Sequence, residues 1–438
     1  MATNVYVSYD FSNKRIGVIG SGSSSIQIVP QLQRIPGTRT TVFARSKTWI
    51  SPSFGQQLWD KYGFEGFSIP PAIQDKFKDP EHYQKFRLSV EEDGNGIHAF
   101  TIRGTPVQTG AKEMFTEHMR ERLKTKPGIF EALLPTFSPG CRRLTPGPGY
   151  LEALTQENVA FITDPITHIS ESAVHTRDGK SHQIDALVCA TGFHASAPPP
   201  FPVIGARGLT LEKKWSQRPI SYLSHSISGF PNFFVMMGPN AAIGSGSLVT
   251  MIESVGDYII RAVRKIQKDN IRSMNVKRER ELDFLEYVDQ YFEGTVFSEE
   301  CNSWYKNKRD GLDESKSKVT GLWPGSTLHC IEAMRSPRWE DYGYTYFGEE
   351  VNSESSAFEM DVEEDYQSTK KRKRVANGEK SAKSRKRVNR LGWLGNGWSV
   401  LQLEERDLAW YLYPEFLELP TAPKPEENAR LKIRPFSY

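Results

Sequence analysis

The stretch that decides the fold is Arg15-Ile16-Gly17-Val18-Ile19-Gly20-Ser21-Gly22-Ser23-Ser24-Ser25, an apolar β-branched run that leads into a turn of small residues. The run predicts a buried strand that ends at Gly20. The residues from 25 to 32 predict a helix that opens in this turn, and residues 40–44 predict a second short strand. A strand, a glycine turn, a helix and another strand indicate the start of a parallel α/β sheet.

The turn has the residue types that a dinucleotide-binding site needs. Gly20 permits the tight turn, Gly22 lets a pyrophosphate approach the backbone, and Ser25 is small enough for close packing of helix and strand. The start of the helix supplies N–H groups and the positive end of its dipole. The candidate cofactor-binding residues here are Gly20, Ser21, Gly22, Ser23, Ser24, Ser25 and Gln27.

The end of the second strand bears on which dinucleotide binds. An NAD site has an acid there for the ribose 2′-hydroxyl, whereas this chain has Arg45-Ser46-Lys47. Two cations suit a 2′-phosphate, and an arginine can meet it with two hydrogen bonds. The alternative is a solvated basic loop. We expect NADPH rather than NADH.

The rest of the chain continues the α/β pattern. Residues 50–135 are rich in aromatic, proline and charged residues and predict a helical insertion that covers a cleft. A long amphipathic helix is expected over about 247–268. Further strands are expected at residues 159–162, 174–176, 185–190 and 232–237.

Composition excludes several classes of protein. The 438 residues carry a net charge of +3, and no apolar run is long enough to cross a bilayer. Cys141, Cys189, Cys301 and Cys330 form no CxxC pair and no cluster with histidine, so we expect neither a disulfide framework nor a zinc site. The body of the chain has no basic excess that would favour nucleic acid. These features predict a reduced, cytoplasmic setting.

One segment departs from this pattern. Residues 349–369 hold eight acids and no base, whereas residues 370–390 hold eleven Lys or Arg and one acid. Such a segment cannot bury apolar area, so 349–389 is expected to be disordered. Within it, residues 370–387 could act as a nuclear localisation signal, which would make the chain a nuclear protein. A solvated charged loop is the simpler interpretation.

Six motifs, taken in chain order, resemble one family of enzymes. They are Asp10-Phe11-Ser12-Asn13-Lys14-Arg15, Ala190-Thr191-Gly192-Phe193, Gly238-Pro239-Asn240, Trp323-Pro324-Gly325-Ser326, Pro337-Arg338-Trp339-Glu340-Asp341 and Leu394-Gly395-Asn396-Gly397. Together with the glycine turn they resemble the class B flavoprotein monooxygenases of the Baeyer–Villiger type, close to fungal members that modify polyketides.

The resemblance implies a Rossmann-like NADP-binding domain over residues 13–192, with the helical insertion at about 50–135, after a linker at 1–12. It also implies the C-terminal part of a FAD-binding domain over 193–348, with a C-terminal segment and tail at 390–438. The family has a first dinucleotide fingerprint for FAD before the second one. This chain starts at Met1 after that point, so the resemblance implies an incomplete FAD-binding domain.

The resemblance also implies the chemistry. NADPH would reduce FAD, a peroxyflavin would form with molecular oxygen, and a ketone would become an ester or lactone. Attack on a soft heteroatom, or hydroxylation, is a close variant. The class-level alternative is an inactive NADP-binding remnant that cannot hold FAD.

The same resemblance assigns roles to individual residues. The register ahead of Tyr150 and Asn158 makes Arg143 the catalytic arginine that holds the charge of the flavin peroxide, with Arg142 as the neighbouring alternative. A fixed cation in a dry site stabilises a developing anion strongly. Thr191 and Gly192, and the segment Gly238, Pro239 and Asn240, are the remaining expected cofactor-binding residues, although each segment could equally be an ordinary turn.

Overall fold

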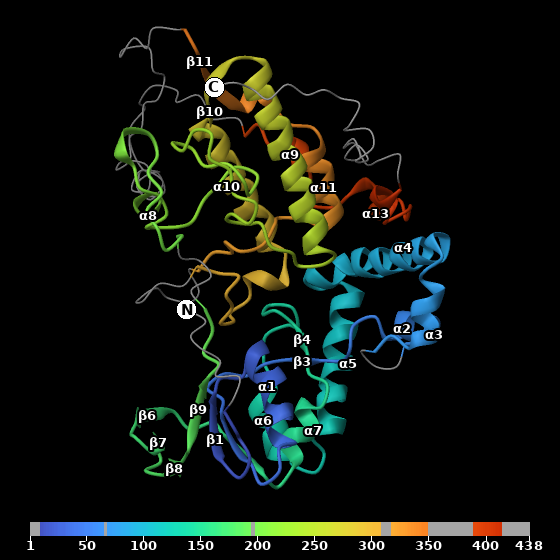
Figure 1. Ribbon diagram of the computed structural model, residues 1–438, viewed down its shortest axis with the longest axis vertical. Coiled ribbons are helices and arrows are strands. Elements are labelled where there is room, and N and C mark those ends of the chain that lie inside the picture. The colour runs from blue at the N-terminus through green and yellow to red at the C-terminus, as the bar shows by residue number, and fades with distance from the viewer. Residues whose placement is uncertain (1–8, 65–67, 194–197, 308–316, 349–388, 414–438) are drawn as a thin grey trace, which may run out of the picture.

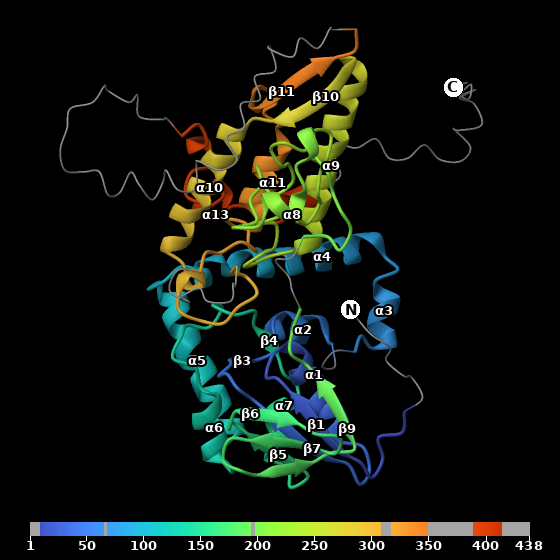
Figure 2. The ribbon, with the colours of Figure 1, turned by 90° about the vertical axis from the view of Figure 1, so that its left-hand side faces the viewer.

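The computed structural model describes residues 9–64, 68–193, 198–307, 317–348 and 389–413. Two lobes lie one above the other along the longest axis of the molecule, and helix α4 (Pro80–Gly96) runs along the boundary between them (Figures 1 and 2). Residues 349–388 of the charged segment discussed above, including the basic run at 370–387, lie outside the described residues.

The lower lobe is built on a parallel sheet. Strands β1 (Arg15–Ile19), β2 (Arg39–Phe43), β5 (Val159–Ile162) and β9 (Ala186–Cys189) lie in the order β5-β2-β1-β9, and every neighbouring pair is parallel. The side chains of Ile16, Val18 and Val42 are fully buried in the centre of the sheet, as expected for strands covered by helices. The predicted α/β fold class and the predicted strands at this sheet are confirmed.

Helices pack on this sheet as the opening stretch predicts. Helix α1 (Ser23–Gln33) follows β1 directly, and α7 (Tyr150–Thr155) packs beside α1 and leads into β5. Between β5 and β9 the chain forms a separate antiparallel sheet of β6 (Ile166–Ile169), β7 (Ala173–Thr176) and β8 (Ser181–Gln183), of which only part of β7 was expected.

The insertion is helical, as predicted. It contains α2 (Gln56–Tyr62), α3 (Pro71–Lys76), α4, the 3₁₀ helix η1 (Ile97–Thr101), α5 (Pro106–Arg122) and α6 (Pro127–Leu133). Four of these helices begin with a proline at the first helical position, where its missing N–H costs nothing. The short parallel strands β3 (Ile50–Ser51) and β4 (Thr145–Pro146) pair at the two ends of the insertion.

The upper lobe is mainly helical. It contains α8 (Leu211–Lys214), α9 (Leu248–Lys268), α10 (Arg278–Glu293), α11 (Thr327–Arg335), α13 (Val400–Leu403) and the antiparallel strands β10 (Ile271–Val276) and β11 (Tyr342–Tyr346). Helix α9 confirms the predicted long helix, and its N-cap is Ser247, whose hydroxyl accepts a hydrogen bond from the Thr250 amide. Helix α9 packs closely on α11 and β10.

The C-terminal part of the described chain joins the upper lobe to the insertion. The Asn95 side chain on α4 donates to the backbone oxygen of Leu408 at 3.0 Å, and the Tyr411 hydroxyl donates to Glu91 at 2.6 Å. Gln84 adds a hydrogen bond to the oxygen of Leu412 at 3.1 Å. The insertion is therefore anchored to both lobes.

The expected strand over residues 232–237 is wrong. Asn232 has a positive φ of 57°, and in the described part of the chain the only bridge from this stretch is the isolated pair of Ser226 and Phe234. A strand needs a partner for its backbone groups. Phe233 and Val235 instead pack against a small apolar cluster that contains Phe230. The segment is therefore a loop whose apolar side chains are partly buried.

Candidate functional site

The glycine turn brings two of the expected motifs together. The Gly20 amide donates to the oxygen of Phe43 at 2.9 Å, and Gly20 has a φ of 124°. A Cβ at this position would lie 2.3 Å from the carbonyl oxygen of Ala190. The turn after β1 therefore lies against the end of β9, where Thr191 and Gly192 are exposed and Gly192 has a φ of 100°.

The start of α1 is open to a ligand. Gly22 is its N-cap, and no side chain in the described part of the chain caps the first turn. A Cβ at Gly22 would meet no described atom within 4 Å. Uncapped amides at the positive end of a helix, reached through a gap beside the backbone, are the features that bind a pyrophosphate.

The last three residues of the turn, Ser23, Ser24 and Ser25, and the following Gln27 differ in what they contact. The Ser23 hydroxyl lies 2.5 Å from that of Thr145 on β4, whereas Ser24 is exposed. Ser25 is fully buried at the first turn of α1. The exposed Gln27 donates its amide to the oxygen of Ser23 at 3.0 Å. Of these four residues, Ser24 and Gln27 are thus the ones that remain at the surface.

The basic loop at the end of β2 is held in place from two sides. The Ser21 hydroxyl donates to the oxygen of Ser46 at 2.8 Å. The Arg142 guanidinium donates to the oxygen of Lys47 at 2.9 Å and to the Ser46 hydroxyl at 3.3 Å. The side chains of Arg45 and Lys47 are exposed. The loop therefore presents two exposed cations on a backbone that hydrogen bonds hold in place.

The two candidate arginines point to different partners. Arg142 contacts the basic loop, as above, whereas the exposed Arg143 lies near the hydroxyl of Tyr305 of the upper lobe. Burial raises the pKa of Tyr305 to about 12, and Arg143 opposes this shift. Sequence reasoning treated the pair as alternatives for one role, but the structure separates them.

A disulfide joins Cys141 and Cys301, 160 residues apart, with a Cα–Cα distance of 6.3 Å. This corrects the expectation that the chain has no disulfide. Spacing along the sequence carried no signal, since the two cysteines lie in different lobes and meet only in the folded chain. Cys189 is exposed, Cys330 is buried, and both are free thiols.

The segment Gly238–Asn240 lies in the upper lobe and is held by its own surroundings. A Cβ at Gly238 would lie 2.4 Å from the Ser224 oxygen, and the Pro239 oxygen accepts a hydrogen bond from Ser221 at 3.0 Å. Asn240 is buried with a φ of 62°, and its side-chain amide donates to the oxygens of Val319 and Leu322. The Asn240 side chain therefore joins this loop to the 319–322 segment.

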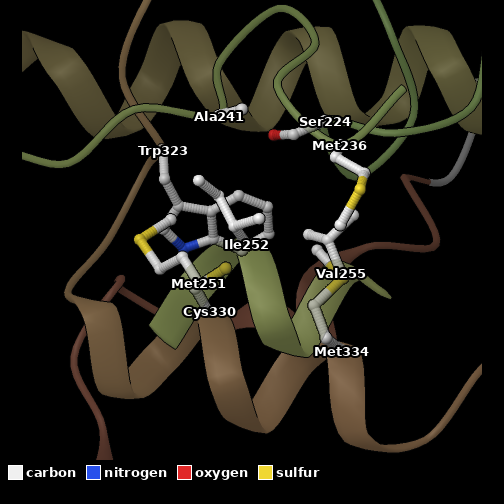
Figure 3. Close-up of a pocket in the computed structure, with 9 residues that line it drawn as sticks. All are labelled: Ser224, Met236, Ala241, Met251, Ile252, Val255, Trp323, Cys330 and Met334. Carbon is white, nitrogen blue, oxygen red and sulfur yellow. The ribbon is translucent and has the colours of Figure 1, made fainter. Parts of the chain in front are cut away.

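A small apolar pocket lies next to this segment, between α9 and α11 and beneath the loops that carry Ser224 and Ala241 (Figure 3). Its lining residues are Ser224, Met236, Ala241, Met251, Ile252, Val255, Trp323, Cys330 and Met334. Burial raises the pKa of the Cys330 thiol well above its usual range. The lining therefore offers packing surface and no acid or base for chemistry near neutral pH.

Buried polar groups surround the start of α9, and sequence reasoning missed them. His98 lies 3.2 Å from the Ser245 hydroxyl through Nδ1, and Thr327 donates to the Ser245 oxygen at 2.7 Å. Burial, aided by His329, lowers the pKa of His98 to about 4. This network packs the start of α9 against η1 and α11.

In the described part of the chain, no helix is both long enough and apolar enough to cross a membrane.

The parallel sheet and the glycine turn define an α/β architecture of the kind that binds dinucleotides, and comparison with known proteins shows which proteins the chain resembles. The chain is 35% identical over 339 residues to the FAD-binding monooxygenase tazF of Aspergillus terreus, which covers 77% of this chain and 60% of that protein. It is 34% identical over 338 residues to the FAD-binding monooxygenase moxY of Dothistroma septosporum, covering 77% and 52%. A Baeyer–Villiger monooxygenase of Pseudomonas aeruginosa is 29% identical over 323 residues, covering 73% and 58%.

Solved structures share the fold. A cyclohexanone monooxygenase from Rhodococcus sp. Phi1 bound to NADP⁺ superposes with a TM-score of 0.61 at 22% identity, covering 78% of this chain and 68% of that one. An oxidised steroid monooxygenase bound to NADP gives a TM-score of 0.61 at 21% identity, covering 77% and 67%. No family model matches the chain.

The chain is therefore similar to FAD-binding monooxygenases of fungi and, at lower identity, to a Baeyer–Villiger monooxygenase. This confirms the resemblance drawn from the six motifs. The chain spans between 52% and 60% of the length of these three relatives.

Proposed function

We propose that the chain is the NADPH-binding part and the C-terminal part of a flavin-dependent monooxygenase that converts a ketone to an ester or lactone. Residues 13–192 would form the NADP-binding domain, residues 193–348 part of the FAD-binding domain, and residues from 390 onward a C-terminal segment. The names of the relatives support FAD and monooxygenase chemistry. Two neighbours of the same fold are bound to NADP.

One observation carries the NADPH assignment. The uncapped start of α1 lies beyond the open position at Gly22, and the Arg45–Lys47 loop is fixed beside it by Ser21 and Arg142. The helix amides would bind the pyrophosphate, and the free cations of Arg45 and Lys47 would bind the 2′-phosphate. The open space at Gly22 and the exposed cations support a phosphorylated dinucleotide at this turn.

The flavin assignment rests on the family and on a surface feature of this chain. Phe193 is 78% exposed directly after Gly192, and Met236 and Met237 are 44% and 48% exposed directly before Gly238. Exposed apolar side chains that flank both motifs suit contact with a flat aromatic ring. When bound, FAD would supply the chemistry that takes electrons from NADPH and activates oxygen.

Arg143 is the residue we propose for catalysis. It is an exposed cation at the boundary between the lobes, close enough to Tyr305 to oppose the rise in the pKa of that hydroxyl. A cation that already lies at the site when negative charge develops beside it stabilises that charge. Arg143 would stabilise that charge, while Arg142 serves the nucleotide loop.

Titration of NADPH and NADH by fluorescence tests the cofactor assignment. We expect NADPH to bind at least about tenfold more tightly, because each hydrogen bond from Arg45 or Lys47 to the phosphate is worth roughly 1.5–3 kcal/mol. The double variant Arg45→Ala/Lys47→Ala should bind the two nucleotides equally. Arg39→Ala removes an exposed cation at the opposite end of β2 and is the matched control.

Product analysis tests the reaction. With NADPH, FAD, oxygen and cyclohexanone as a probe ketone, mass spectrometry should detect a product one oxygen heavier than the ketone. Tight NADPH binding without any oxygenated product from this ketone or a panel of others would favour the inactive NADP-binding alternative.

A further inference from the structure

Three consecutive residues of one loop lie against two different parts of the molecule. Cys141 is bonded to Cys301, Arg142 donates hydrogen bonds to Ser46 and Lys47, and Arg143 lies near Tyr305. The loop follows α6 and precedes β4, so it lies where the chain returns from the helical insertion to the nucleotide-binding lobe. We call residues 138–143 the strap.

The disulfide is one of several contacts between the strap and residues 299–305. The backbone amide of Ser138 donates to the Glu299 carboxylate at 2.7 Å, so the strap meets the 299–305 segment at both of its ends. Cys141 is fully buried, and Cys301 is 8% exposed. Gly140 has a φ of 93°, and a Cβ there would meet Phe100 at 2.9 Å. The strap thus has little room to shift while the bond is closed.

The strap also controls the geometry of the nucleotide loop. Arg142 makes two hydrogen bonds to the loop that carries Arg45 and Lys47, and its own position is set by the bonded Cys141 next to it. Preorganised cations bind a phosphate more tightly than cations on a loop that must be ordered on binding. Closing the disulfide should therefore favour the phosphorylated nucleotide in particular.

We propose that the Cys141–Cys301 disulfide is a redox-controlled positioning element that sets the preference of this site for NADPH. The proposal rests on the proposed NADPH function of the Arg45–Lys47 loop. In the closed form Arg142 is held against that loop. In the open form the strap loosens, Arg142 leaves its two acceptors for part of the time, and affinity for the 2′-phosphate falls.

The redox step balances with a dithiol as the reductant. A thiolate of the dithiol attacks the sulfur of Cys301, the more exposed of the two residues, and releases the Cys141 thiolate. The second thiol of the reductant then closes its own disulfide and frees Cys301. The dithiol loses two electrons and two protons, and the protein gains two thiols.

The experiment compares oxidised wild-type protein, the same protein after dithiothreitol, and the double variant Cys141→Ser/Cys301→Ser. Cys189→Ser, which removes an exposed free thiol, is the matched control. Three quantities are measured: the 141–301 cross-linked peptide under non-reducing conditions, amide hydrogen exchange over residues 44–48 and 138–145, and the Kd values for NADPH and NADH.

We expect the cross-linked peptide in oxidised wild type and in Cys189→Ser. Reduction or the double variant should raise the NADPH Kd about tenfold, equivalent to losing one hydrogen bond to a charged group, and leave the NADH Kd within about twofold. Exchange over both segments should rise. The double variant should not respond to dithiothreitol.

Absence of the cross-linked peptide, or identical exchange in the closed and open forms, would overturn the proposal. Since reduction acts on folded wild-type protein, a double variant that fails to fold leaves that comparison intact. Equal Kd values for NADPH and NADH in the oxidised protein would refute the proposed function instead. Exchange over residues 44–48 would then still decide whether the strap holds the loop.

Discussion

The carbonyl oxygen of Ala190 leaves no room for a side chain on Gly20, because a Cβ there would lie only 2.3 Å away. This contact brings the ends of β1 and β9 together, so that the glycine turn and the Thr191–Gly192 segment lie side by side. The neighbouring Gly22 is in the opposite situation, with a φ of −88° and open space where its Cβ would be. Two glycines of one turn therefore serve different purposes.

Gly20→Ala should destabilise the fold. The substitution combines a φ of 124° with a backbone clash that no rotamer can relieve. We expect a loss of about 2–4 kcal/mol in the free energy of unfolding, typical of a strained backbone position with overpacking. Urea denaturation measures this loss, and an unfolding free energy within error of wild type would contradict the assigned geometry.

Gly22→Ala should do the reverse. Its backbone conformation suits alanine, so the free energy of unfolding should change by less than about 0.5 kcal/mol. The added methyl group would stand where we expect the pyrophosphate, so the Kd values of NADPH and NADH should rise together. Nucleotide titration of the two alanine variants separates the structural glycine from the binding one.

The buried ion pair of Lys214 and Glu281 offers a test of stability in the upper lobe. The two charged groups lie 2.6 Å apart with side-chain exposures of 6% and 0%, and Glu281 also accepts from the Ser228 amide at 3.1 Å. Lys214→Met would leave a buried carboxylate without its cation, which should cost about 3–5 kcal/mol. Denaturant unfolding gives this value directly.

Two further variants complete this test. In Lys214→Met/Glu281→Gln the amide has no charge but still accepts from Ser228, so most of the lost stability should return. Lys85→Met breaks the exposed pair with Glu81, for which a loss below about 1 kcal/mol is expected. Equal losses in Lys214→Met and Lys85→Met would show that the Lys214–Glu281 pair is not buried in solution.

Buried histidines predict how stability depends on pH. Burial lowers the pKa of His225 to about 3, and of His98 and His329 to about 4. In the unfolded chain these groups would bind a proton near pH 6.5. The unfolded state therefore takes up protons first, and stability is complete above about pH 6.5 and falls as the pH drops toward 4.

Each such histidine should contribute a slope of the order of 1 kcal/mol per pH unit within that window. The measurement is the free energy of unfolding between pH 7 and 5. His225→Asn should flatten the profile, whatever its effect at pH 7. A wild-type profile that is flat over this range would argue against neutral, buried histidines.

Local patterns predicted what local interactions determine. Strand β1, the glycine turn, α1 and α9 follow from apolar periodicity and small residues at adjacent positions, and the structure confirms them. Residues 232–237 have the composition of a strand but meet no partner strand among the described residues, and pairing is not a property of the segment itself.

For the candidate site, too, local features could be predicted from the sequence, whereas contacts between distant residues could not. The residues of the turn could be found from their order, but the contacts of the strap could not. Cys141 and Cys301 are 160 residues apart, and Arg142 reaches a loop almost a hundred positions earlier in the chain. Such contacts depend on the path by which the insertion returns to the sheet, and this path cannot be predicted from the spacing of residues in the sequence.

Arg142 and Arg143 lie against different parts of the molecule, so variants of the two can test the catalytic assignment. The two quantities to compare are the affinity for NADPH and the ratio of oxygenated product to hydrogen peroxide. In the flavin-loaded enzyme, Arg143→Ala should bind NADPH with nearly unchanged affinity, because Arg143 contacts Tyr305 and not the basic loop. Oxygenation should fall by about 10²–10³, the usual effect of removing one fixed charge stabiliser. NADPH would still be consumed, with oxygen released as hydrogen peroxide. Arg143→Lys should restore little, since its point charge lacks the planar fork of arginine.

Arg142→Ala is the matched variant, since it removes the neighbouring cation. It should raise the KM for NADPH by loosening the loop at Ser46 and Lys47, and should leave the ratio of oxygenated product to hydrogen peroxide close to that of wild type. Measuring KM and this ratio in both variants shows which arginine acts in NADPH binding and which acts in oxygenation. If Arg142→Ala lowers the ratio and Arg143→Ala does not, the catalytic role passes to Arg142. If neither variant lowers it, the anion is stabilised by groups outside this loop.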